Sequence, residues 1–214
     1  MKAEIHTRSR LSFFRMSFAA FLLCGASLCL AQAQTTETLV IFRHGEKPAG
    51  GLGQLNCMGL NRSLALPDVL LAKFGHPGYL FAPDPAQKVD DYSLGGYSYV
   101  RPLATIEPTA IRLGMSVNAQ IGYTQIDKLQ NELLAPKYAS STVFVAWEHV
   151  FEEHLAKNIV KKFGVDPKVV PAWSNSDYDM IYAIRLTRNG GKTTVSFAVD
   201  HEGLNDKLSN ECPR

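Results

Sequence analysis

The sequence has no internal repeat, no low-complexity tract and no apolar run long enough to cross a membrane comfortably. Its longest apolar stretch, MSFAAFLLCGASLCL, lies just under the ~18 residues expected of a membrane-spanning helix. Four basic residues precede that stretch: Lys2, Arg8, Arg10 and Arg15. Ala31 and Ala33 follow it, as small residues where a signal peptidase reads the chain. The pattern predicts a signal peptide over residues 1–34 and one exported domain over residues 35–214; the alternative is an uncleaved membrane anchor.

The sequence also lacks a strong charge of either sign. It contains 22 Lys and Arg against 20 Asp and Glu. The predicted leader holds four of the basic residues and one acidic residue, Glu4, so the rest of the chain is close to neutral. No basic tract remains outside the leader, and this argues against a nucleic-acid partner. Contact with a membrane is expected only through the signal peptide before its cleavage.

Cysteine is scarce. Of four cysteines, two lie in the predicted leader, and only Cys57 and Cys212 remain in the exported part. In an oxidising compartment such a pair can form a disulfide, which would tie the C-terminal tail to the segment after the first strand. The sequence gives no distance between the two residues, so it favours neither the disulfide nor the free thiols.

Strand and helix patterns alternate along the chain. Short apolar runs at 38–42 (TLVIF) and 141–147 (STVFVAW) predict buried strands. The runs YDMIYAIRL and TTVSFAV flank Asn189-Gly190, which is a strong hairpin signal. This order predicts an α/β fold, a three-layer sandwich whose mostly parallel central sheet is flanked by helices and followed by a C-terminal β-hairpin.

Helical spacing of apolar residues, with a glycine or proline at the end, predicts four helices within 59–75, 102–114, 124–136 and 148–164. In the first, Leu60 and Leu64 belong to the predicted apolar face, and Pro67 predicts a kink. In the third, that face is expected to carry Ile126, Leu129 and Leu133. The segment 76–97 is rich in Pro, Gly, Asp and Tyr and predicts an irregular excursion that shapes a binding cleft.

Charged side chains follow both predicted strands directly. Arg43-His44 ends the first strand, and Glu148-His149 ends the second. If these strands are neighbours, both histidines open at the same edge of the sheet, where ligands gather in folds of this class. Imidazole can attack phosphorus, and the planar guanidinium of arginine matches phosphate oxygens. The pattern therefore predicts a phosphate site with a histidine nucleophile.

The motif RHGEKP after a buried strand resembles the signature of the histidine phosphatase superfamily, also called phosphoglycerate mutase-like. The stretches NCMGLNRSLAL, RPLATIEPTAIRLG and VFVAWEHV are similar to further parts of the pattern, so that the resemblance spans roughly residues 38–164. It implies that His44 is the phosphorylated nucleophile. It also implies that Arg43 binds the phosphoryl group and that His149 is the second catalytic histidine.

The chain departs from the family pattern at two places. Where many members have a second pocket arginine this chain has Thr105, and the nearest upstream arginine, Arg101, is the candidate replacement. The general acid is open between Glu148, which is favoured, and Asp127.

Two more basic side chains complete the candidate site. Arg62 is interpreted as a solvated helix residue that can rim the substrate pocket, and Lys47 as a source of positive potential beside it.

Two other motifs have a plain structural interpretation. His149 and His154 are five residues apart, so they do not share the helix face that a zinc motif requires. His154, Glu152 and Glu153 are therefore interpreted as a solvated face. The stretch WSNSDYD at 173–179 is more typical of a loop with Asx turns than of a substrate contact.

Together these features predict a secreted or periplasmic phosphatase that needs neither metal nor organic cofactor. It would hydrolyse a small phosphomonoester, such as a phosphosugar or a phosphoester of the cell envelope. Two alternatives remain: a non-catalytic exported module that binds phosphate or another anion, and a metal-dependent hydrolase that uses His44, His149 and nearby carboxylates.

Overall fold

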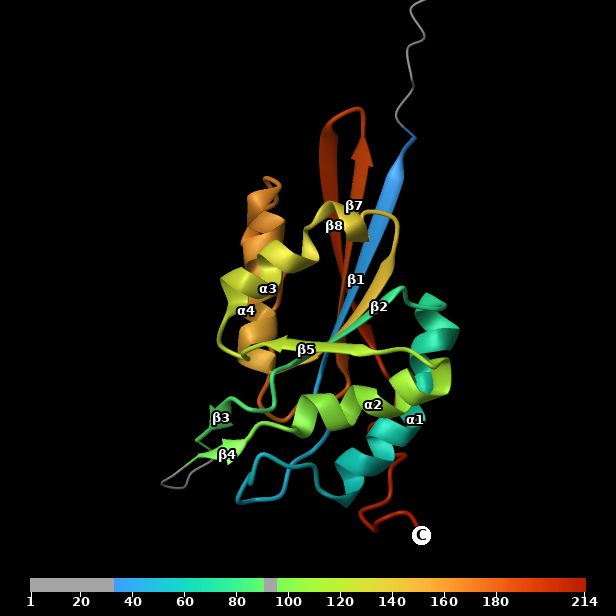
Figure 1. Ribbon diagram of the computed structural model, residues 1–214, viewed down its shortest axis with the longest axis vertical. Helices are drawn as coiled ribbons and strands as arrows, with labels where there is room; N and C mark the ends of the chain where they lie inside the picture. The colour runs from blue at the N-terminus through green and yellow to red at the C-terminus, as the bar shows by residue number, and fades with distance from the viewer. Residues whose placement is uncertain (1–32, 91–95) are drawn as a thin grey trace, which may run out of the picture. The chain divides into compact units, whose positions relative to one another are not determined.

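The computed structural model describes residues 33–90 and 96–214 (Figure 1). The predicted signal peptide lies almost entirely outside these residues, as does part of the predicted irregular excursion. At the centre is a six-stranded sheet with the order β5-β2-β6-β1-β7-β8. Its strands are β1 (Thr35–Arg43), β2 (Tyr79–Pro83), β5 (Val117–Ile121), β6 (Thr142–Trp147), β7 (Met180–Asn189) and β8 (Lys192–His201). The short strands β3 (Lys88–Val89) and β4 (Tyr97–Ser98) pair with each other separately.

The sheet is mixed. Strands β5, β2, β6 and β1 run parallel to one another, whereas β7 and β8 form an antiparallel hairpin that adds to β1. Gly190 and Gly191 form the hairpin turn with φ angles of 54° and 81°, which glycine adopts without a steric penalty. The predicted C-terminal hairpin is confirmed.

Helices cover both faces of the sheet. The helices α1 (Cys57–Phe74) and α2 (Arg101–Leu113) pack on one face, and α3 (Ile126–Leu133) and α4 (His149–Lys162) pack on the other (Figure 1). Two single-turn 3₁₀ helices, η1 (Pro136–Tyr138) and η2 (Pro167–Val169), complete the chain. The predicted three-layer α/β class is confirmed.

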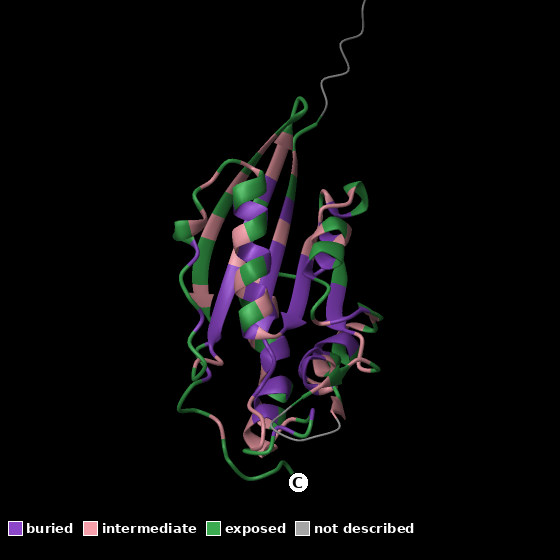
Figure 2. Ribbon diagram, turned by 90° about the vertical axis from the view of Figure 1, so that its left-hand side faces the viewer, coloured by how far each residue is buried: buried purple, intermediate pink, exposed green. Residues whose placement is uncertain are grey.

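The hydrophobic core is divided by the sheet into two halves. Alternate residues of β1 point to opposite faces, so Leu39 and Ile41 pack toward α3 and α4 while Val40 and Phe42 pack toward α1 and α2. All four are fully buried. Figure 2 shows buried residues concentrated along the strands and on the inner sides of the helices. Strands covered on both faces explain why TLVIF and VFVAW are continuous apolar runs.

Two local predictions were wrong. Leu60 and Leu64 were assigned to the apolar face of α1, but both are exposed, and the buried face carries Arg62 and Ser63 together with Leu66 and Leu70. The helix continues through Pro67 without a break. The apolar pattern of α1 thus marks its inner face only in part, because an arginine and a serine also lie on that face.

The second error concerns the segment 76–97, which contains the central strand β2. Leu80, Phe81 and Ala82 are buried in it, although the flanking Gly and Pro suggest a loop. Strand β5 was not predicted either.

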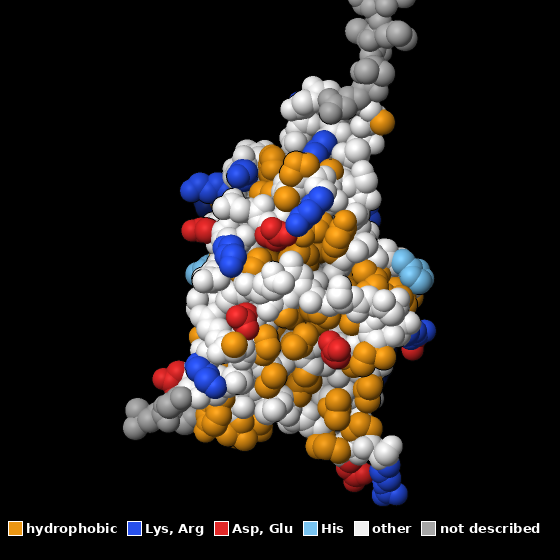
Figure 3. Space-filling view, viewed as in Figure 1, with side chains coloured by type: hydrophobic (Ala, Val, Ile, Leu, Met, Phe, Trp, Pro, Cys, Tyr) orange, Lys and Arg blue, Asp and Glu red, His pale blue; other side chains and the backbone are white. Residues whose placement is uncertain are grey.

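On the face shown in Figure 3, positive and negative side chains are interspersed among apolar ones, without a continuous basic patch. Within residues 33–90 and 96–214, no helix combines the length and the hydrophobicity needed to cross a bilayer.

Candidate active site

The two predicted strand ends lie side by side. Strands β1 and β6 are parallel neighbours, with Arg43 opposite Trp147. The backbone N–H of His44 extends this ladder by donating to the carbonyl of Trp147 at 3.0 Å. The chain leaves the sheet at the carboxyl edge of both strands, into His44 after β1 and into Glu148-His149 after β6. The condition that the two strands are neighbours is met, and the pairing brings the two histidines to one edge.

His44 is buried, with 1% of its surface exposed. Its Nδ1 lies 2.7 Å from the carbonyl oxygen of Gly45, so Nδ1 carries the proton and Nε2 keeps its lone pair. Burial, together with the positive charges of Arg101 and Arg43, lowers the pKa of His44 well below its ordinary value. The neutral tautomer that a nucleophile needs is therefore the one this environment favours.

Gly45 makes the turn after His44 possible because the backbone passes very close to the first turn of α1. A Cβ atom on Gly45 would lie 2.8 Å from the carbonyl oxygen of Gly59 and 2.9 Å from its Cα. The N–H of Gly45 also donates to Thr105 Oγ1 at 2.9 Å. The glycine of the RHG motif is thus required by packing, and it fixes the position of the preceding histidine.

Arg43 is held from the C-terminal half of the chain. Its Nη1 donates to the carbonyl oxygens of Asn175 and Asp177 at 2.8 and 2.9 Å, and its guanidinium carbon lies 3.9 Å from the ring centroid of Tyr178. The Arg43 side chain is almost fully buried. These contacts all come from the loop 173–179, for which the sequence suggested no role in the site.

Arg101 begins α2 and is buried, with its guanidinium carbon 4.7 Å from the ring centroid of Tyr99. Tyr99 also packs edge-on against His44, with the ring centroids 6.1 Å apart. Thr105, one helical turn after Arg101, accepts the N–H of Gly45 and donates to the Arg101 carbonyl at 2.8 Å. Thr105, the residue at the usual arginine position, therefore links the turn after His44 to the start of α2.

Each ring nitrogen of His149 lies close to a side-chain oxygen atom. Its Nε2 lies 2.5 Å from Asn175 Oδ1, and its Nδ1 lies 2.5 Å from a carboxylate oxygen of Glu148. Asn175, which no sequence signal singled out, therefore binds Arg43 through its backbone and His149 through its side chain.

Glu148 is the N-cap of α4 and accepts the backbone N–H groups of Val150 and Phe151. Burial opposes ionisation of this carboxyl, but its hydrogen bond with His149 and the capping bonds prevail, so the pKa of Glu148 lies below its ordinary value. A general acid needs the opposite shift. The geometry suits Glu148 to orient His149 rather than to donate a proton.

Glu152 lies one turn further along α4 and is fully buried, so its assignment to a solvated face was wrong. One of its carboxyl oxygens accepts the N–H of Trp147 at 3.1 Å. Burial, reinforced by the nearby charge of Glu148, raises the pKa of Glu152 well above its ordinary value. His154 on the same helix is exposed, as predicted.

Arg62 is also buried, which corrects its interpretation as a solvated residue. Its Nε and Nη2 bind the carboxylate of Glu46, its Nη1 binds Glu202, and Nη2 also binds Asn205. Burial raises the pKa of Glu202 to about 8. Because these partners occupy every nitrogen of the guanidinium, Arg62 serves this ion-pair network and is not placed to bind a phosphate directly.

The remaining candidates lie apart from these contacts. Asp127 is exposed at the start of α3, in a surface pocket that it shares with Phe151 and His154. That pocket includes none of the predicted phosphate ligands. Lys47 is half-buried, and its carbonyl accepts the side chain of Asn56. Within the described residues, no group of three or more His, Cys, Asp or Glu side chains is arranged to hold a metal ion.

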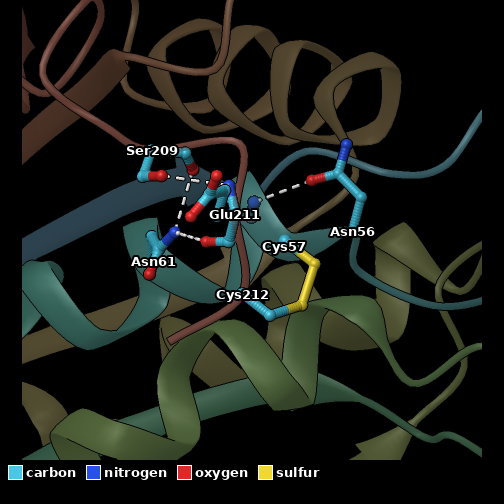
Figure 4. The surroundings of a disulfide bond; sticks show 7 residues. Asn56, Cys57, Asn61, Ser209, Glu211 and Cys212 are labelled. Atoms are coloured by element: carbon cyan, nitrogen blue, oxygen red, sulfur yellow. Dashed lines mark hydrogen bonds between the residues drawn. A yellow bond between two sulfur atoms is a disulfide. The ribbon is translucent and has the colours of Figure 1, made fainter. Parts of the chain in front are cut away.

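Cys57 and Cys212 form a disulfide, with their Cα atoms 4.5 Å apart (Figure 4). The bond joins the first residue of α1 to the C-terminal tail. Next to it, the side chain of Asn61 donates to the carbonyl oxygens of Ser209 and Glu211 (Figure 4). The tail is therefore fixed on α1 by a covalent bond and two hydrogen bonds.

No protein-family model and no curated protein matches the chain. Among solved structures, the fold is similar to a protein named as the phosphohistidine phosphatase SixA from Nakamurella multipartitia, with 16% identity, a TM-score of 0.49, and coverage of 80% of this chain and 98% of that one. It is also similar to a phosphoglycerate mutase from Bacillus anthracis strain Sterne, with 12% identity, a TM-score of 0.48, and coverage of 77% and 93%.

A third similar structure, named as SixA from Agrobacterium tumefaciens, has 9% identity and a TM-score of 0.41, with coverage of 76% and 97%. Phosphoglycerate mutase gives its name to the superfamily that the sequence resembles. At these identities and TM-scores the likeness carries no argument about activity, which therefore has to be argued from the site.

Proposed function

We propose that this protein is an exported histidine phosphatase that hydrolyses a phosphomonoester through a phosphohistidine on His44. The observation that carries the proposal is the setting of His44: a neutral imidazole with Nδ1 on a carbonyl, surrounded by Arg43, Arg101 and His149 at one edge of the sheet. Three cationic or proton-carrying groups around one buried nucleophile suit a doubly charged phosphoryl group.

In the first half of the reaction, Nε2 of His44 attacks phosphorus in line with the leaving oxygen, and the phosphorus–oxygen bond of the ester breaks. The leaving oxygen takes a proton from solvent and departs as the alcohol. Arg43 and Arg101 bind the phosphoryl oxygens and balance their charge. Gly45 keeps the proton on Nδ1, so that the phosphorylated ring is a cation stabilised by the same carbonyl.

His149 is the proton-carrying group on the opposite side of the site. Glu148 and Asn175 orient its ring through their contacts with Nδ1 and Nε2. We assign Glu148 as a positioning residue for His149, and assign no proton transfer to Asp127. In the second half of the reaction, water attacks phosphorus, phosphate leaves, and His44 returns to its neutral form.

Export is the second part of the proposal. Residues 1–34 have the pattern of a signal peptide, leaving 35–214 as a single catalytic domain. The Cys57–Cys212 disulfide is consistent with an oxidising compartment outside the cytoplasm. A phosphosugar or an envelope phosphoester would then be a natural substrate.

The test follows phosphate release from an aryl phosphate by the purified protein in EDTA, with wild type and His44→Ala compared. Activity that resists EDTA and disappears in the variant supports the proposal. Activity that EDTA abolishes would instead support the metal-dependent alternative.

One observation favours a second candidate, an anion-binding module without turnover. The pKa of Glu148 is lowered and Asp127 lies apart from the site, so neither carboxyl has the properties of a general acid. This candidate predicts that wild type binds inorganic phosphate but forms no phosphoenzyme with any ester. The phosphatase and the binding module are distinguished by quenching the reaction rapidly without acid and then measuring protein-bound phosphate.

A further inference from the structure

A pocket of about 580 Å³ lies beside Tyr178. Tyr178 lines this pocket, packs over Arg43 and places its ring centroid 6.2 Å from that of His44. Glu46, two residues after the nucleophile, forms another part of the wall. The pocket is therefore adjacent to the point where the leaving group of a phosphoester has to be accommodated.

The C-terminal tail forms another wall of the pocket, and hydrogen bonds and a disulfide hold this tail in place. Leu204, Asn205 and Asp206 belong to it. Asp179 accepts the backbone N–H groups of Gly203, Leu204 and Asn205 at 2.7–3.1 Å. Beyond these residues, Asn61 and the Cys57–Cys212 disulfide fix the rest of the tail on α1 (Figure 4). The tail is thus anchored at both ends of the stretch that forms the pocket.

The charge of this pocket is opposite to that of the phosphate site. Among the described residues that line it, Arg62 is the one cation, and its guanidinium is bound by Glu46 and Glu202. Asp206 adds a further, exposed carboxylate. The two carboxylates that line the pocket, Glu46 and Asp206, thus outnumber its single guanidinium.

We infer that this pocket is the leaving-group subsite, and that it selects phosphomonoesters whose leaving group carries an ammonium group and no second anion. The inference rests on the proposed function, because it takes the leaving group to extend from the phosphoryl site beside His44. A substrate of this class is bipolar, with phosphate against Arg43 and Arg101 and the ammonium group against Glu46 and Asp206. A second phosphate or a carboxylate on the leaving group would meet like charge there.

Three esters of equal length test the charge preference: 2-aminoethyl phosphate, 2-hydroxyethyl phosphate and phosphoglycolate. Their dissociation constants are measured by calorimetry with His44→Ala, which cannot turn them over, and their kcat/KM values with wild type. The amine ester is expected to bind about two- to fivefold more tightly than the hydroxyl ester, as for a single exposed ion pair. Phosphoglycolate is expected to be the weakest.

Asp206→Asn is the diagnostic variant. Asp206 has a φ angle of 64°, a conformation that asparagine tolerates as well as aspartate does, so the backbone of the tail is kept. The variant is expected to remove most of the preference for the amine ester over the hydroxyl ester. The matched control is Asp68→Asn, an exposed carboxylate of α1 that pairs with Arg112 and does not line the pocket.

The outcomes separate this inference from the proposed function. Equal or tighter binding of phosphoglycolate, or an unchanged preference in Asp206→Asn, overturns the subsite while leaving the histidine phosphatase intact. The expected order of binding without any turnover by wild type keeps the subsite and rejects catalysis. Failure of wild type and His44→Ala to bind any of the three esters rejects both.

Discussion

Nδ1 of His44 lies 2.7 Å from the carbonyl oxygen of Gly45. A carbonyl accepts and never donates, so this contact keeps the proton on Nδ1 and directs phosphorylation to Nε2. We expect the trapped phosphoenzyme to carry its phosphoryl group on Nε2 alone, as determined by phosphorus–nitrogen coupling in NMR spectra of labelled protein. A phosphoryl group on Nδ1 would contradict the assignment of the tautomer.

The lowered pKa of His44 leads to a second, independent prediction, which concerns how the protonation of this residue depends on pH. Imidazole has an ordinary pKa of 6.5, and burial with two nearby arginines shifts the value for His44 downward. His44 should therefore stay neutral, and competent as a nucleophile, at pH values where a free histidine is mostly protonated. Its Cε1–H resonance, assigned with His44→Ala, is expected to show no titration midpoint at or above pH 6.5. A midpoint there would show that the arginines are further from the ring than we describe.

Arg43→Lys tests whether the planar guanidinium is needed. Lysine keeps the charge but cannot both reach the carbonyls of Asn175 and Asp177 and present a fork to phosphate. The expected loss in kcat/KM is about 10²–10³-fold, as for removal of one preorganised donor. Arg185→Lys, on the exposed side of β7, is the matched control and should retain full activity. A small loss in kcat/KM in Arg43→Lys would show that Arg43 contributes only its positive charge.

Glu148→Gln distinguishes a positioning residue from a general acid. If Glu148 orients His149, as their 2.5 Å contact indicates, the variant should lose up to about 100-fold in kcat, equally with aryl and alkyl phosphates. A general acid matters most when the leaving group is poor. A loss confined to the alkyl ester would therefore return the acid role to Glu148.

Arg62→Met tests the buried network behind the active site. Removing the guanidinium leaves Glu46 and Glu202 buried without their partner, and the expected loss in the free energy of unfolding is about 3–5 kcal/mol. Adding Glu202→Gln should recover part of that loss, and denaturant unfolding measures both. The comparison variant, Arg112→Met, breaks an exposed pair with Asp68 and should change stability by less than about 1 kcal/mol. Equal effects of the two arginine changes would contradict the structural role of Arg62.

The fold class could be predicted because the strongest local signals agree with the tertiary structure. The strands β1 and β6 are uniformly apolar because both of their faces are covered, and α3 buries Ile126, Leu129 and Leu133 as its spacing predicts. The first helix shows the limit of this approach. Its inner face contains Arg62, which the apolar pattern assigns to solvent, and two of the partners that satisfy it there, Glu202 and Asn205, are more than a hundred residues away in the sequence.

The candidate site was predictable to a similar extent. A charged residue and a histidine directly after a buried strand form a local signal, and both strand ends meet at one edge as expected. The loop 173–179 was not predictable, because it binds Arg43 chiefly through backbone carbonyls, which every residue type possesses. Asn175 likewise acquires its contact with His149 only from the path of the chain.

The disulfide joins residues that are 155 positions apart and fixes the last residues of the chain on its first helix. His44 and its glycine turn precede by more than 150 residues the segment that forms a wall of the adjoining pocket, so this segment is synthesised after them. The wall is therefore completed later than the turn at His44, and the Cys57–Cys212 bond that helps to fix it forms only where an oxidant is present.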